Sequence, residues 1–145
     1  MPVLNMKVSG PRHSGKVEAI TNLLLDLTTN VLGKKRELTA ITFQFIDSQD
    51  WVVGGTPLSQ LGKSSFYFDI KVTDETNTKD EKARYIKGVF EGMSDILGVV
   101  HEESYIYIED VRAAAYGYGG KTQEYRYHQS NLNHTAREDT LVPNA

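Results

Sequence analysis

The strongest constraint on the fold is an internal repeat, because the two halves of the chain carry the same order of apolar segments. In the first half, apolar residues recur at steps of 3, 4, 3 and 4, the spacing of one helical face: Val17, Ile20, Leu24, Leu27 and Val31. In the second half the same steps recur 66 positions later: Ala83, Ile86, Phe90, Met93 and Leu97. Gly33 and Gly98 follow the two sets as plausible helix ends. Each half therefore predicts one amphipathic helix.

Segments with the apolar content of strands flank each predicted helix. They cover residues 1–8 and 38–46 in the first half, and residues 66–72 and 105–109 in the second. Paired glycines close each half, at Gly54-Gly55 and Gly119-Gly120. This order predicts two tandem β-α-β units with right-handed crossovers, which together form a four-stranded sheet with two helices on one face. The fold class is α/β (α+β).

We expect a single domain over residues 1–145, with a first unit at 1–64, a second at 65–124 and a polar C-terminal tail at 125–145. Two helices cover only one face of a four-stranded sheet. The strands also carry more aromatic side chains than that face needs: Phe43, Phe45, Phe66, Phe68, Tyr105 and Tyr107. We therefore predict oligomerisation through the sheet, with the tail docking on a neighbouring subunit.

Composition narrows the class of function. The 145 residues carry a net charge of −3, which argues against a nucleic-acid partner or an anionic membrane surface. The absence of cysteine excludes disulfides, thiolate metal sites and cysteine nucleophiles. The four histidines lack metal-ligand spacing, and no apolar run reaches the ~20 residues of a membrane span. We expect a cytoplasmic protein without a cofactor or metal.

Pro2 at the start of the first strand is the residue with the clearest chemical potential. Removal of Met1 would leave Pro2 as a secondary amine, and burial would lower its pKa because desolvation disfavours the charged form. Such an amine can accept and return a proton near pH 7. A Met-Pro start is also a common sequence with no chemical meaning, so Pro2 alone does not decide the function.

The free Pro2, the tandem β-α-β units and the apolar pieces ending in paired glycines together resemble the tautomerase superfamily. That family includes 4-oxalocrotonate tautomerase, macrophage migration inhibitory factor and cis-3-chloroacrylic acid dehalogenase. The clearest local match is to macrophage migration inhibitory factor, over residues 105–107 and 110–120. The resemblance covers about residues 2–120. It implies a homotrimer, a small carboxylate substrate, and an amino-terminal proline in a pocket between subunits.

The resemblance also assigns roles by position. Pro2 and Tyr105 are similar to the catalytic residues, Tyr105 being contributed by the adjacent subunit. The substrate-binding residues that it implies are Lys34, Arg12, Trp51, Ile70 and Tyr107. The implied reaction is keto–enol tautomerisation of a 2-keto or 2-hydroxy-dienoic acid, with the enolate oxygen stabilised by a cation or hydroxyl donor. Each cation can equally be a solvated charge, and each aromatic residue can equally be a packing residue.

Several family residues are missing from the chain. A second carboxylate-binding arginine would fall near Thr39 or Ala40, so a monoacid is favoured over a diacid. The paired arginines and the glutamate of the dehalogenases would fall near residues 69–74 and 115–117, where neither occurs. Dehalogenation is therefore not expected.

Two other functions fit parts of the sequence. Residues 10–17 nearly match the phosphate-binding loop G-x-x-x-x-G-K-[ST], but Val17 stands where the magnesium-binding hydroxyl is needed and Pro11 removes an amide. A ferredoxin-like module that binds a small ligand, or a trimer that acts by protein contact, would need no catalytic proline.

Overall fold

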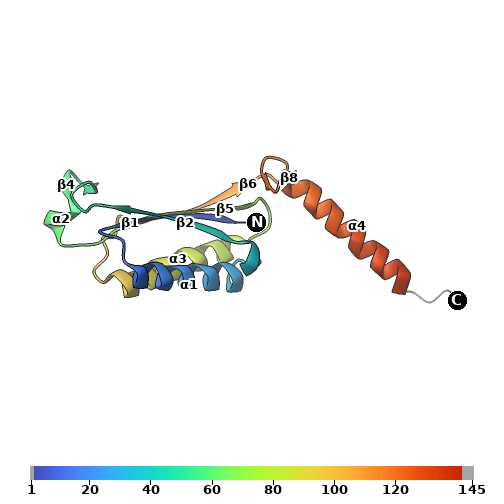
Figure 1. Cartoon of the computed structure of the whole chain (residues 1–145), viewed down its shortest axis with the longest axis horizontal. Coiled ribbons are helices and arrows are strands. Elements are labelled where there is room, and N and C mark those ends of the chain that lie inside the picture. Colours follow the sequence, from blue (N-terminus) through green and yellow to red (C-terminus); the bar gives the residue numbers. More distant parts are fainter. Residues whose placement is uncertain (1, 142–145) are drawn as a thin grey trace.

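The protein has the two tandem β-α-β units that the repeat predicts (Figure 1). The computed structural model describes the backbone of residues 2–141 and the side chains of residues 2–132. The first unit consists of β1 (Val3–Ser9), α1 (Ser14–Asn30), the 3-10 helix η1 (Arg36–Leu38) and β2 (Ala40–Ile46). The second consists of β5 (Phe66–Thr73), α3 (Lys79–Leu97) and β6 (Tyr105–Val111).

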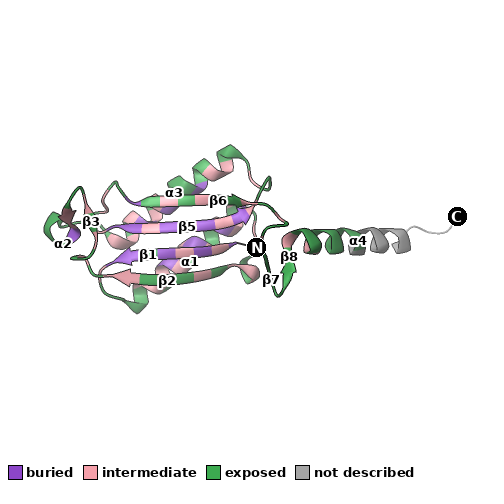
Figure 2. Ribbon diagram, turned by 90° about the horizontal axis from the view of Figure 1, so that it is seen from above, coloured by how far each residue is buried: buried purple, intermediate pink, exposed green. Residues whose placement is uncertain are grey.

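These strands form one sheet in the order β2-β1-β5-β6. β1 is parallel to β2 and β5 is parallel to β6, while β1 and β5 join the two units in an antiparallel pair. Both helices lie on the same face of the sheet, and the other face is bare (Figures 1 and 2). The predicted fold class is confirmed. Because β1 and β5 are antiparallel, their first residues lie at opposite ends of the sheet.

Each unit ends in a small hairpin built on its glycine pair. β3 (Val52–Val53) and β4 (Thr56–Pro57) flank Gly54 and Gly55, whose φ angles are 58° and 81°. β7 (Gly117–Tyr118) and β8 (Lys121–Thr122) flank Gly119 and Gly120, whose φ angles are 61° and 77°. Two consecutive left-handed residues make the tight turn that suits a twisted hairpin, and glycine adopts them without steric cost. A short helix, α2 (Leu58–Leu61), follows the first hairpin.

The core lies between the sheet and the two helices. Along β1 and β5, alternate residues point into it and are at most 1% exposed: Leu4, Met6, Val8, Phe66, Phe68, Ile70 and Val72. Phe43 and Phe45 on β2 pack against the same core. Only Tyr105 and Tyr107 of the six strand aromatics lie on the bare face, where they are 50% and 47% exposed. The bare face is therefore more polar than the aromatic count predicted.

The buried faces of the helices include polar groups that a hydrophobic period does not detect. On α1 the fully buried residues are Ile20, Leu24 and Thr28, and on α3 they are Tyr85, Val89 and Met93. The prediction that Ala83 and Ile86 face the core is wrong, since Ala83 is exposed and Ile86 is 40% exposed. The face of α3 is turned because the Tyr85 hydroxyl is 2.9 Å from the hydroxyl of Thr28 inside the core.

The C-terminal segment forms one long helix, α4 (Gln123–Leu141), which extends away from the sheet and from α1 and α3 (Figures 1 and 2). No glycine or proline interrupts residues 123–141, which explains a helix in a polar segment. Its exposed side chains include Tyr125, Tyr127 and Leu132. Docking of residues 125–145 on a neighbour stays a prediction, and residues 142–145 lie outside the described part of the chain. None of the described helices has the length and hydrophobicity needed to cross a bilayer.

The Thr28–Tyr85 pair yields a prediction about stability. In Tyr85→Phe, the hydroxyl of Thr28 would stay buried without its partner, at a cost of about 1–3 kcal/mol in the free energy of unfolding. Thr28→Val in the same chain removes the orphaned hydroxyl, so the double variant should lose less stability than the two single losses added together. Urea unfolding of the four proteins measures this coupling, and strictly additive losses would contradict it.

Candidate functional site

Pro2 lies at the start of β1, in the interior of the sheet, and is buried. Its carbonyl accepts a hydrogen bond from the amide of Ala40 at 3.4 Å, which extends the pairing of β1 and β2. Beside it is a pocket of about 520 Å³ lined by three segments: Pro2 and Val3, residues 37–40, and residues 116–118. The pocket is the clearest candidate for a small-molecule site because the predicted catalytic residue forms part of its wall.

Tyr116 forms one wall of this pocket, just before the β7–β8 hairpin. Its hydroxyl is hydrogen-bonded to the side-chain oxygen of Thr73, which ties the hairpin to the end of β5. Burial raises the pKa of Tyr116, so the phenol is uncharged at neutral pH. The pocket wall therefore includes a tyrosine that the sequence analysis did not identify, with its hydroxyl bonded to Thr73.

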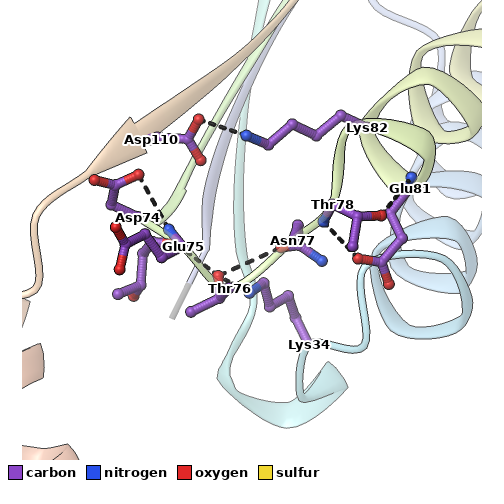
Figure 3. A network of polar contacts seen from close by, with 10 residues as sticks. Lys34, Asp74, Glu75, Thr76, Asn77, Thr78, Glu81, Lys82 and Asp110 are labelled. Carbon is purple, nitrogen blue, oxygen red and sulfur yellow. Dashed lines mark hydrogen bonds and ion pairs between the residues drawn. The ribbon is translucent and has the colours of Figure 1, made fainter.

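Lys34 follows the C-terminus of α1 and lies beside the same end of the sheet (Figure 3). Its Nζ donates to the hydroxyl of Thr76 at 2.7 Å, and that hydroxyl donates to the Thr73 carbonyl at 2.5 Å. Lys34 is thus linked to Tyr116 only indirectly, through Thr76 and Thr73, and it does not line the Pro2 pocket. Desolvation is the largest influence on Lys34 and lowers its pKa from the ordinary 10.5, although Glu81 and Asp110 oppose the shift.

The turn that holds Lys34 is fixed by its own polar contacts (Figure 3). Thr78 and Glu81 form a capping box at the start of α3, and Asn77 donates to the Leu32 carbonyl at 2.9 Å. Lys82 and Asp110 pair at 2.6 Å and so link α3 to β6. In the described part of the chain Lys34 has a hydroxyl partner and no ion pair. Its ammonium can therefore accept an anion without first releasing a carboxylate.

The predicted pocket residues Trp51 and Tyr105 lie at the opposite end of the sheet. They line a second pocket of about 470 Å³ with residues 52–54, Phe66, Tyr67 and Glu103. The Tyr105 hydroxyl donates to the Glu103 carboxylate at 2.5 Å, and this hydrogen bond is the main reason that the pKa of Tyr105 is raised. Tyr107 stacks on Tyr105 with ring centres 6.1 Å apart. These side chains do not meet Pro2 of their own chain.

The two pockets are related by the internal repeat. Each is built from the start of a strand, the segment that precedes its parallel neighbour, and the hairpin of one unit. Glu103 lies 66 positions after Glu37, and Tyr116 lies 65 positions after Trp51. The repeat was therefore the available signal for Glu37 and Tyr116, which the sequence analysis missed. Only the first pocket has a proline at its strand start, because Phe66 begins β5.

Ile70 and Arg12 also lie away from the Pro2 pocket of their own chain. The side chain of Ile70 points into the core and is 0% exposed, so its contact with substrate stays a prediction that the single chain does not support. Arg12 follows the C-terminal end of β1 and lines a separate pocket of about 450 Å³ with Asp47. Within one chain, Arg12 cannot reach a substrate at Pro2, because β1 spans the sheet between them.

The structure argues against a phosphate-binding loop at residues 10–17. The ring Nδ1 of His13 caps α1 by accepting hydrogen bonds from the amides of Gly15 at 3.1 Å and Lys16 at 3.4 Å. These are amides that a phosphate-binding loop would offer to its ligand. Among the described residues, no group of three or more histidine, aspartate or glutamate side chains is placed to hold a metal ion.

No protein-family model matches the sequence, and the curated proteins contain no match to it either. Solved structures do match. A fused 4-OT in a symmetric trimer has a TM-score of 0.73 at 17% identity, over 84% of this chain and 96% of that chain. Pt0534 inactivated by 2-oxo-3-pentynoate has a TM-score of 0.75 at 12% identity, over 86% and 98%. MIF2 from Leishmania major has a TM-score of 0.68 at 16% identity, over 84% and 97%.

This chain shares the fold of these solved structures. The resemblance seen in the sequence is thereby confirmed at the level of architecture, including the four-stranded sheet and the two helices on one face. At 12–18% identity, the structural likeness does not show which residues of this chain have the roles of residues in those proteins. Any such role has to be argued from the geometry around Pro2.

Proposed function

We propose that the protein is a keto–enol tautomerase that acts on a small 2-keto or 2-hydroxy-dienoic acid, with Pro2 as the acid–base group. The observation that carries this proposal is the position of Pro2, which is buried and also lines a pocket of about 520 Å³. The fused 4-OT neighbours support the reaction class, and the inactivation of Pt0534 by 2-oxo-3-pentynoate supports a 2-oxo acid. The proposal requires removal of Met1, which lies outside the described residues.

In the proposed reaction, the Pro2 nitrogen takes a proton from one atom of the substrate and returns it to another. A buried amine suits this role, since desolvation keeps it largely uncharged at neutral pH. Lys34 binds the substrate carboxylate. The uncharged hydroxyl of Tyr116 donates to the enolate oxygen, where negative charge accumulates.

We also propose that a homotrimer completes the site, with Tyr105, Trp51 and Tyr107 contributed by a neighbouring subunit. The trimeric 4-OT neighbours support this assembly, as does the separation of the two pockets within one chain. Exposed Tyr125 and Leu132 on α4 would then contact the neighbour. Arg12 has a role only if the assembly brings it to another subunit's Pro2. The proposal also includes the division of the chain after residues 64 and 124. It further includes a cytoplasmic location and a reaction that needs no cofactor.

The direct test is ketonisation of a monocarboxylic enol acid, phenylpyruvate enol, monitored by ultraviolet absorbance. Pro2→Ala should lose at least about a hundredfold in kcat/KM, because general acid–base catalysis contributes typically ~10²–10⁴-fold. Native mass spectrometry of the same sample should show three chains, each lacking Met1. Decay no faster with the wild-type protein than with Pro2→Ala would reject the enzyme and favour a non-catalytic binding module.

The lowered pKa of Lys34 predicts a pH dependence for substrate binding. A lowered pKa means that the ammonium loses its proton at a lower pH than an ordinary lysine, so KM should rise at a lower pH than a lysine with the ordinary pKa of 10.5 would give. Lys34→Arg should remove this rise, because the guanidinium stays charged. Lys34→Gln should raise KM roughly tenfold or more at pH 7, the value of a charge-assisted hydrogen bond. Lys87→Gln, on the exposed side of α3, is the charge control, and an equal rise in that variant would contradict the assignment.

A further inference from the structure

We infer that Glu37 is a specificity-determining residue that excludes substrates with a second carboxylate from the Pro2 pocket. This inference rests on the proposed function, since it concerns which acid the same site accepts. Glu37 begins the lining segment 37–40, within η1 and directly before β2. Glu37 is exposed to solvent and not buried in the core, while it also lines the pocket.

Glu37 keeps its negative charge available to a ligand. In the described part of the chain it has no ion-pair partner, and the neighbouring Arg36 is engaged with Asp26 at 2.8 Å. The remaining lining side chains are apolar or carry only hydroxyls: Pro2, Val3, Leu38, Thr39, Ala40, Tyr116 and Tyr118. Glu37 is thus the one formal charge among the residues that line this pocket.

In the proposed site the substrate carboxylate binds Lys34, which does not itself line the pocket. A series of hydrogen bonds joins the Lys34 ammonium to Thr76, Thr76 to the Thr73 carbonyl, and the Thr73 hydroxyl to Tyr116 in the pocket wall. A monoacid can place its single carboxylate at Lys34 and leave an uncharged end toward Glu37. A diacid of the same length would bring its second carboxylate into a pocket whose only lining charge has the same sign.

The second pocket of the chain has a carboxylate at the position equivalent to Glu37. Glu103 occupies the position of Glu37 in the second pocket, 66 residues later, beside Tyr105 and Trp51. If a neighbouring subunit contributes that pocket to the site, it brings a second carboxylate, and the residues that line that pocket include no cation. The trimer would therefore strengthen the selection against diacids.

The test compares two six-carbon acids, 2-oxohexanoate and 2-oxohexanedioate, which differ in the second carboxylate. Binding is measured by NMR titration of wild-type protein and Glu37→Gln, so that the result does not depend on turnover. The affinity ratio of diacid to monoacid should rise about fivefold in Glu37→Gln, the effect of removing one like charge about 4 Å away in a water-exposed setting. Glu18→Gln removes the same charge from the exposed surface of α1 and should leave the ratio unchanged.

An unchanged ratio in Glu37→Gln, an equal rise in Glu18→Gln, or no binding of either acid would overturn the inference. Failure of the proposed function looks different. In that case the binding ratio shifts as expected, but wild-type protein ketonises phenylpyruvate enol no faster than Pro2→Ala does.

Discussion

The pairing of β1 in the interior of the sheet is the constraint on which the rest of the structure depends. Val3 is paired with Ala40 on one side and with Lys71 on the other, so the register of the first strand is set from both edges. A slip of one residue would move Leu4, Met6 and Val8 from the core to the bare face, which burial strongly disfavours. The same register fixes Pro2 one residue before the first pair, in the wall of a pocket.

The internal repeat explains why the chain has two similar pockets, and the difference between its units explains why only one pocket has a proline. Two similar units joined antiparallel at β1 and β5 produce two similar pockets at opposite ends of one sheet. Only the first unit begins with a proline that can become a chain terminus. Phe66, at the equivalent place, is an internal residue whose amide nitrogen cannot act as a base. Catalysis is therefore expected at one pocket per chain, while the second can serve as the wall of a neighbour's site.

The architecture could be predicted because it follows from a period that appears twice. The four strands of the sheet and the two helices that cover it lie where the repeat predicts them. The paired glycines were noted in the sequence, but the hairpins that they form and the helices α2 and α4 were not predicted. Which face of α3 is buried could not be predicted, since the hydroxyl partner of the buried Tyr85 lies 57 positions away in the sequence. Ile70 was assigned from the resemblance, but strand alternation buries it. Glu37 and Tyr116 were missed because neither has a chemical motif, although Trp51 and Glu103 mark the same positions in the other unit.

The proposed catalysis depends on the charge of one nitrogen, that of Pro2. Protein labelled with ¹⁵N-proline allows the Pro2 resonance to be followed by NMR across pH. A buried catalytic terminus predicts a secondary amine that titrates below the ~7.7–8.0 of an ordinary α-amino group and is largely uncharged at pH 7. An amide resonance at every pH, which would mean that Met1 is retained, or an amine still protonated at pH 9, would contradict the account.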